Sequence, residues 1–168
     1  MANRAYLFSS DLPDAWAFPE DRYYDSRWNI PLSWFFFYEV PDIKHVRVTF
    51  MESAWDELKL ASDREAAIRR FEVRRPVLEA AVGAGLPTGA IDALVNDVRG
   101  WQGRYLLLDP EEILDDEAEK DLDLLSRILQ AIEMGGSDAV LEAARRFVYP
   151  FDDDPKRCRD VIIGCTYW

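Results

Sequence analysis

The residues in this chain best suited to chemistry are its carboxylates, because histidine and cysteine are scarce. The sequence has 32 Asp and Glu residues, a single histidine, His45, and two cysteines, Cys158 and Cys165. A Ser-His-Asp or Cys-His nucleophilic site would have to use His45. His45 lies beside Arg47 in an alternating segment without a local motif. We therefore interpret His45 as an ordinary surface histidine.

Metal and phosphate sites lack their usual sequence patterns. One histidine and two cysteines cannot supply a histidine-rich metal site or a cysteine-rich zinc site. The pair Asp115-Asp116 and the run 152–154 could bind Ca²⁺ or Mg²⁺, but neither has calcium-loop spacing with a closing Glu. We interpret them as a helix start and a polar turn. Gly83-Ala84-Gly85 follows a predicted helix, so it reads as a helix stop rather than a phosphate loop. The sequence predicts no cofactor and no metal.

Negative charge is concentrated in the acidic segment, residues 109–123. This segment contains nine acids and one lysine, so it carries −8 of the formal net charge of −12. A concentrated field selects partners, whereas a diffuse field mainly keeps a protein in solution. A pI near 4.5 argues against binding to nucleic-acid phosphates and to anionic membrane surfaces. We therefore exclude both as partners and favour a basic protein.

A polar, irregular stretch at 10–29 is the second candidate surface, because it is rich in aromatic residues. Its end mixes Tyr and Trp with Arg and hydrogen-bonding side chains, as binding hot spots do. The alternative is that these rings fold back onto the core. Taken with the acidic segment, the predicted partner-binding residues are Tyr23, Tyr24, Arg27, Trp28, Asp115, Asp116, Glu117, Glu119 and Asp123.

The bulk properties indicate one globular domain, residues 1–168, in a reducing compartment. Of the 168 residues, 49% are hydrophobic, so a sizeable core is expected. The first residues lack the apolar core of a signal peptide. The longest apolar stretch, around 30–38, is interrupted by Pro31 and Ser33 and is too short to span a bilayer. The two cysteines form no secreted disulfide framework, so we predict a cytoplasmic protein.

Hydrophobic periodicity predicts about four strands. The segment 44–50 alternates between apolar and polar residues, and 3–9 and 104–108 are short apolar runs. We predict that the last strand, 160–168, is central in the sheet. The aromatic segment 30–39 fits either a buried strand or a short buried helix, and we favour the helix.

Capping signals and apolar stripes predict four or five helices. Ser62-Asp63-Arg64-Glu65 is a capping box that opens a helix, which Pro76 should kink or split before Gly83 ends it. Further helices are predicted at 88–100, at 118–132 and from Ser137. The prediction is an α+β fold in which these helices cover one face of a mixed or antiparallel sheet.

The first of these helices is also the most basic part of the chain. We predict that its cations pair with the acidic segment, within the fold or between subunits, or form a solvated helix face. These cations are Arg64, Arg69, Arg70, Arg74 and Arg75.

Two segments carry a resemblance to a known group. Met1-Ala2-Asn3-Arg4-Ala5-Tyr6-Leu7-Phe8-Ser9-Ser10 and, later, Ser26-Arg27-Trp28-Asn29-Ile30-Pro31-Leu32 resemble small uncharacterised bacterial proteins that begin Met-Ala-Asn-Arg-x-Tyr-Leu-Tyr-Ser. The likeness covers about the first third of the chain, and Phe8 stands where the group has tyrosine. The resemblance implies a bacterial cytoplasmic protein and transfers no catalytic residue.

No group of residues specifies a reaction, so we predict a non-enzymatic binding protein. A bacterial immunity protein or inhibitor that occludes a basic partner fits the acidic segment and the aromatic stretch. A carboxylate-based hydrolase with an aromatic-lined cleft is the first alternative, although the separation of two carboxylates cannot be read from sequence. A structural homodimer is the second alternative.

Overall fold

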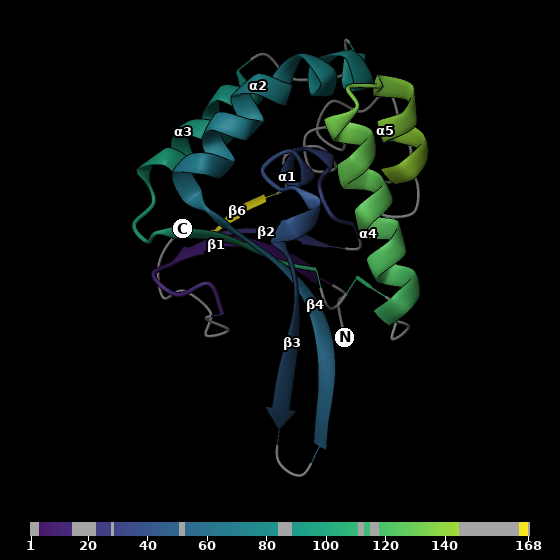
Figure 1. Ribbon diagram of the computed structural model, residues 1–168. Helices are drawn as coiled ribbons and strands as arrows, with labels where there is room; N and C mark the ends of the chain where they lie inside the picture. Colours follow the sequence, from purple (N-terminus) through teal and green to yellow (C-terminus); the bar gives the residue numbers. More distant parts are fainter. Residues whose placement is uncertain are drawn as a thin grey trace.

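The α+β fold predicted from the sequence is confirmed by the computed structural model. The structure describes residues 4–14, 23–27, 29–50, 53–83, 89–110, 113–114, 118–144 and 165–167. Within these ranges, a single antiparallel sheet has helices packed against one of its faces (Figure 1).

The sheet has six strands in the described part of the chain, rather than about four. Their bounds are β1 Arg4–Ser10, β2 Tyr23–Arg27, β3 Ile43–Phe50, β4 Ser53–Asp63, β5 Tyr105–Asp109 and β6 Cys165–Tyr167. Their order across the sheet is β3-β4-β5-β1-β2-β6, and every neighbouring pair is antiparallel. Strands β1, β3, β5 and β6 lie where the sequence predicts strands. The additional strands are β2 and β4.

Strand β2 shows that the prediction of an irregular stretch at 10–29 is wrong for 23–27. Tyr24 and Ser26 point to the helical side of β2, while Asp25 points to the other side, and all three are buried. A strand buried on both faces lacks the polar alternation by which a strand is recognised. Its two neighbours in the sheet, not its own sequence, therefore make β2 a strand.

The C-terminal strand lies at an edge, so the prediction of a central strand is wrong. Within the described ranges, β6 pairs with β2 alone. The central places belong to β5 and β1, where Leu106, Leu107 and Leu108 are completely buried. The apolar run at 160–168 therefore predicted a strand, but it did not predict whether that strand lies at the centre or at an edge of the sheet.

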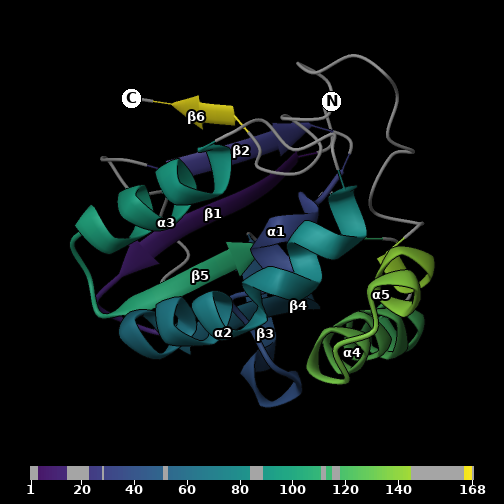
Figure 2. The ribbon, with the colours of Figure 1, turned by 90° about the horizontal axis from the view of Figure 1, so that it is seen from above.

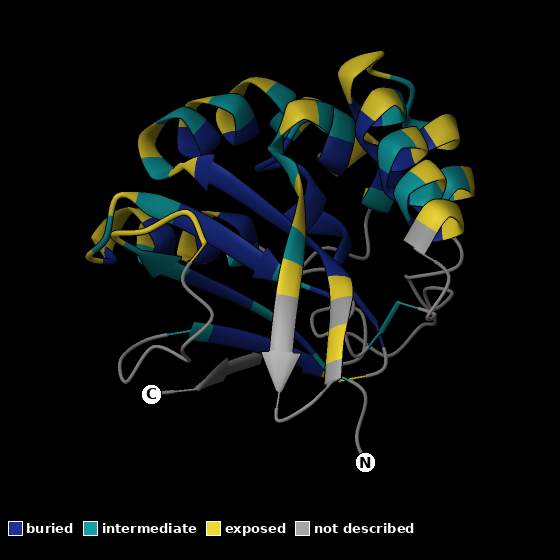
Figure 3. Ribbon diagram, turned by 60° about the horizontal axis from the view of Figure 1, so that its bottom comes forward, coloured by how far each residue is buried: buried dark blue, intermediate teal, exposed yellow. Residues whose placement is uncertain are grey.

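The helices form the second layer, as Figure 2 shows from above. Their bounds are α1 Leu32–Phe35, α2 Arg64–Val82, α3 Ala90–Gly100, α4 Ala118–Glu133 and α5 Ser137–Ala144, with a short 3₁₀ helix at Val40–Asp42. The helices bury one apolar side each against the sheet, and Figure 3 shows exposed residues on their outer sides. This arrangement is the helix-covered sheet that the sequence predicts.

Helix α2 begins and ends close to the predicted residues but is not split. Its N-cap is Asp63, whose Oδ1 accepts from the Ala66 backbone N–H at 3.1 Å, so the cap is one residue after Ser62. The helix continues through Pro76 to Val82. Gly83 ends it with a φ of 63°, a conformation that glycine adopts without steric cost.

The aromatic segment 30–39 forms the centre of the core, and its prediction as a short buried helix is confirmed. Trp34, Phe35, Phe36, Phe37 and Tyr38 are all 0% exposed. Helix α1 comprises only four residues. The carbonyls of Ser33, Trp34 and Phe35 accept from backbone N–H groups three residues later, whereas the carbonyls of Phe37 and Tyr38 lie beyond the helix.

Two arginines of α2 supply donors to those carbonyls. Arg70 donates to the Phe37 carbonyl at 2.6 Å, and Arg74 donates to the Tyr38 carbonyl at 2.6 Å. Arg70 also contacts the carboxylates of Asp42 at 2.9 Å and Glu39 at 3.0 Å. Burial raises the pKa of Asp42, and the positive charge of Arg70 only partly offsets that rise. Arg70 therefore joins α2, the aromatic segment and the following 3₁₀ helix.

Strands β3 and β4 extend beyond the rest of the sheet as a two-stranded arm (Figure 1). The two strands pair with each other along 43–50 and 53–60, but β4 pairs with β5 only through 60–63. On the arm, exposed Arg47 and Asp56 are register partners and form an ion pair at 3.1 Å. The base of the arm is buried at Glu57, Leu58 and Lys59.

We expect Arg70→Met to lower the free energy of unfolding by about 3 kcal/mol, because it removes a donor from the buried Phe37 carbonyl and the cation that faces the Asp42 carboxylate. The adjacent Arg69→Met is the matched control. Arg69 is exposed and its ion pair with Glu65 measures 3.7 Å, so its loss should stay within about 0.5 kcal/mol. Urea unfolding measures both variants, and equal losses would contradict the role given to Arg70.

Candidate functional site

The aromatic residues predicted to bind a partner separate into buried and surface positions on β2. Tyr24 is 3% exposed, Tyr23 is partly buried and Arg27 is exposed. Trp28 lies outside the described residues. The predicted cluster therefore does not form one continuous surface.

Tyr24 belongs to the core, so its assignment as a partner contact is corrected. Its hydroxyl donates to Asp97 Oδ2 of α3 at 2.6 Å. Its ring lies 6.5 Å from that of Trp34 and 5.9 Å from that of Trp101, measured between centroids. The alternative in which the rings fold back onto the core is therefore the one that describes Tyr24.

The acidic segment also divides between the interior and the surface. Asp109 pairs with Lys59 at 2.6 Å, and Asp121 is 1% exposed. Glu119 and Asp123 are exposed on α4. Asp115, Asp116 and Glu117 lie outside the described residues. Sequence counting therefore overstates the charge that this segment presents to solvent.

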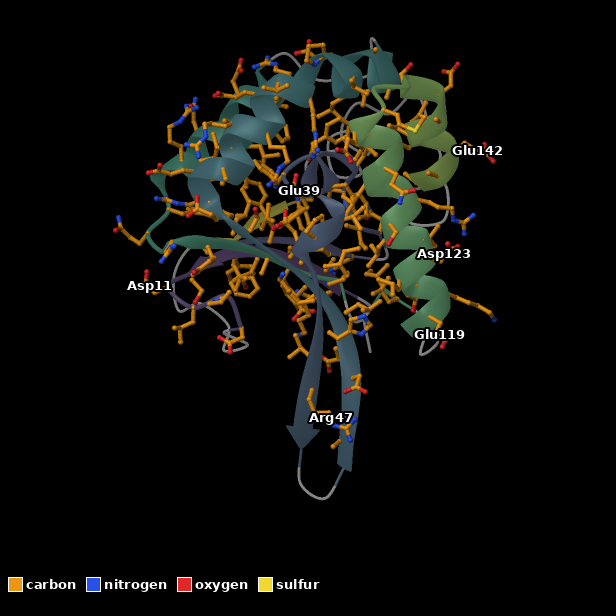
Figure 4. The ribbon with its side chains drawn as sticks, in the orientation of Figure 1. Asp11, Glu39, Arg47, Glu119, Asp123 and Glu142 are labelled. Atoms are coloured by element: carbon orange, nitrogen blue, oxygen red, sulfur yellow. The ribbon has the colours of Figure 1, made fainter. Side chains whose placement is uncertain are left out.

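Exposed carboxylates continue beyond the acidic segment along α4 and into α5. Figure 4 shows Glu119, Asp123 and Glu142 directed away from these helices. We define the α4–α5 acidic surface by its exposed acids, Glu119, Asp123, Glu133, Asp138 and Glu142. The cations of residues 118–144 are Lys120 and Arg127, and Arg127 pairs with Asp123 at 2.8 Å. This surface is therefore net negative.

A second group of charges lies on the sheet face opposite the helices. We define this charged row as Arg4, Asp25, Asp109, Lys59 and Glu57, from four different strands. Strand register places Tyr6 between Asp25 and Asp109. Arg4 pairs with Asp25 at 2.6 Å, and Lys59 pairs with Asp109 at 2.6 Å and Glu57 at 2.9 Å.

Burial perturbs the ionisation of this row in two ways. Burial raises the pKa of Asp25, and the nearby charges of Arg4 and Arg27 only partly offset it. For Lys59, burial acts to lower the pKa, but the hydrogen bonds and charges of Asp109 and Glu57 together outweigh burial and raise it. Lys59 is therefore held as a cation and is a poor nucleophile.

Sequence reasoning missed the charged row because its members are distant in sequence. Lys59 stands between Leu58 and Leu60, all three buried on β4. A lysine in a buried apolar run requires an acidic partner. That local signal could have identified Lys59, but only the sheet register identifies Asp109 as its partner.

Among the described residues, the arginines of α2 do not pair with the acidic segment. Their partners lie in α2 itself, in α3, in the segment that follows α1 and, for Arg70, at Ser62 of β4. Arg75 pairs with Glu79 at 2.6 Å and Asp92 at 2.5 Å, and Arg64 donates to backbone carbonyls at the end of α3. The prediction that these arginines meet the acidic segment within the fold is therefore wrong for the described residues.

The remaining candidates for chemistry are dispersed. His45 is exposed on β3, as expected for a surface histidine, and Cys165 lies in β6 while Cys158 is outside the described ranges. In the part of the chain that the structure describes, no three His, Cys, Asp or Glu side chains are grouped to hold a metal ion. Among the same residues, no helix is both long enough and apolar enough to cross a membrane.

Comparisons with protein-family models, with curated proteins and with solved structures found no match.

We expect Lys59→Met to lower the free energy of unfolding by about 3–5 kcal/mol, because it leaves two carboxylates facing each other in a buried site. Lys44→Met is the matched control. Lys44 is the register partner of Lys59 on β3 but is exposed, so its loss should stay within about 0.5 kcal/mol. The double variant Glu57→Leu/Lys59→Met should recover part of the loss. Failure to recover any stability would contradict charge burial as the cause.

Asp25→Asn tests the ionisation of the same row through the pH dependence of stability. Because the pKa of Asp25 is raised from 3.8, its contribution to stability is complete below that pH and is lost as pH rises through the folded-state value. We expect the unfolding free energy of the wild type, minus that of Asp25→Asn, to fall as pH rises above 3.8. A difference that rises over this range would show that Arg4 outweighs burial.

Proposed function

We propose that this chain is a non-enzymatic, cytoplasmic binding protein that uses the α4–α5 acidic surface to occlude a basic protein partner. A bacterial immunity protein or inhibitor is the class that this mode of action fits. The observation that supports the proposal is the presence of five exposed carboxylates on two adjacent helices. The proposed contact differs from the predicted one because it omits the buried Tyr24 and adds Glu133, Asp138 and Glu142.

Electrostatics gives this surface a specific role. A net charge of −12 attracts cations generally, but acids gathered on one side also orient an approaching partner. Such steering increases the association rate more than it increases affinity. Because the screening length is about 8 Å at physiological ionic strength, exposed carboxylates lose this effect as salt rises. Salt dependence localised to α4 and α5 is therefore the property to measure.

A carboxylate-based hydrolase is favoured by one observation, the raised pKa of Asp25 near Tyr6 and Tyr23. A general acid requires such a shift. However, Asp25 is 1% exposed and is already paired with Arg4 at 2.6 Å. These contacts support a structural role for the carboxyl, so we retain the binding protein as the conclusion.

The test is affinity capture from lysate of the native host at low and moderate salt, using the tagged protein and two charge-reversal variants. We expect one stoichiometric basic partner, captured less at moderate salt. Glu119→Lys/Glu142→Lys should lower the association rate of the purified pair roughly tenfold.

Asp11→Lys/Asp14→Lys is the matched control for this variant. It changes the net charge by the same amount, but both residues lie on the turn after β1, away from α4 (Figure 4 labels Asp11). The control should associate at nearly the wild-type rate. Equal slowing in both variants would show that net charge acts without a defined surface, and absence of any partner at either salt would contradict the proposal.

A further inference from the structure

Helix α2 has a second apolar stripe, separate from the one it buries. Its buried residues are Ala67, Ile68, Phe71, Leu78 and Ala81. Val73, Pro76, Val77 and Ala80 follow the spacing i, i+3, i+4 and i+7, which places them together on another side of the helix. Val73, Pro76 and Ala80 are exposed and Val77 is partly buried. We refer to these four residues as the exposed α2 stripe.

The stripe extends toward α4 through an exposed methionine. Val73 is 80% exposed and Met134, just after α4, is 86% exposed. The Cγ2 atom of Val77 lies 3.9 Å from the position a Cβ atom would take at Gly135, the residue after Met134. The second half of α2 therefore packs beside the end of α4, and both views show these ends together (Figures 1 and 2).

Carboxylates of the α4–α5 acidic surface lie next to this apolar region. Glu133 directly precedes Met134, and Asp138 lies in the first turn of α5; both are exposed. Three cations of α2 lie near this region. Arg74 donates to the Tyr38 carbonyl and its charge also interacts with Glu133, Arg75 pairs with Glu79 and Asp92, and exposed Arg69, one turn before Val73, pairs with Glu65 at 3.7 Å. An apolar surface with an acidic border is the result.

We propose that the exposed α2 stripe and Met134 form a docking site for a basic amphipathic helix of a partner protein. This inference rests on the proposed function and identifies the chemistry of the partner. The apolar face of such a helix would lie on Val73, Val77 and Met134, while its Lys and Arg residues would face Glu133 and Asp138. The flexible thioether of methionine suits a contact that must adapt to the side chains of another protein.

Charge argues against a second copy of this chain as the occupant. In a symmetric dimer built on this surface, the same patch would face itself, so Glu133 and Asp138 would approach the corresponding acids. Like charges brought together at an interface are unfavourable. A basic occupant removes that repulsion.

The test uses a fluorescein-labelled helical peptide of Leu and Lys, about 18 residues long, with Leu at i, i+3, i+4 and i+7. Its binding to the full chain is measured by anisotropy at low salt. We expect the wild type to bind, and Val73→Ser/Met134→Ser to bind at least about tenfold more weakly. Leu12→Ser is the matched control, because Leu12 is also exposed, at 60%, but lies on the turn after β1. It should bind like the wild type.

Two further measurements decide the chemistry of the occupant. A peptide of equal charge with Ala in place of Leu should bind at least tenfold more weakly, since only charge attraction remains. Sedimentation should show a wild-type monomer. Equal binding of both peptides, equal binding of Val73→Ser/Met134→Ser and wild type, or a dimer that Val73→Ser/Met134→Ser dissociates would each overturn the inference.

The two double variants distinguish failure of the docking site from failure of the proposed function. If Glu119→Lys/Glu142→Lys slows association with the captured partner but Val73→Ser/Met134→Ser binds the peptide normally, the acidic surface stands and the docking site fails. If neither variant has an effect, both fail.

Discussion

The contact of Arg70 and Arg74 with the aromatic segment is the constraint on which the rest of this fold depends. Five consecutive large side chains from Trp34 to Tyr38 are completely buried, so their backbone is buried with them. Buried carbonyls without donors are costly, and α1 is too short to supply those donors. Because α2 supplies them, it must cross directly over this segment. Helices α3, α4 and α5 each contact α2 in that position.

The opposite face of the sheet is organised by paired charges. Lys59, Asp109, Asp25 and Arg4 lie in strands that the helices cover from the other side, and each charge has a partner of opposite sign. Ion pairs of this kind add little net stability compared with apolar residues, but breaking one is expensive. Their main consequence is specificity of register, since a slip of one residue would turn these charges toward the apolar helical layer.

The α4–α5 acidic surface and the arginine-rich helix α2 are different parts of the outer layer. Acids gather on α4 and α5, while the arginines of α2 are occupied by contacts within the chain. The α4–α5 acidic surface is net negative, and an apolar stripe on α2 lies at the end of the same region. Long-range attraction and short-range apolar contact are thus adjacent, which is the usual organisation of a protein-binding surface.

The sequence by itself determined the elements whose signals are local. The alternation in 44–50, the apolar stripe in 118–132 and Gly83 predicted β3, α4 and the end of α2. Only the tertiary structure decided that Tyr23–Arg27 is a strand, that β6 lies at an edge and that Tyr24 is in the core. It also decided which acids reach solvent, because Asp109 meets Lys59 across the β4–β5 register. Periodicity reports how one segment divides between core and solvent, whereas pairing of distant residues depends on which strands and helices become neighbours.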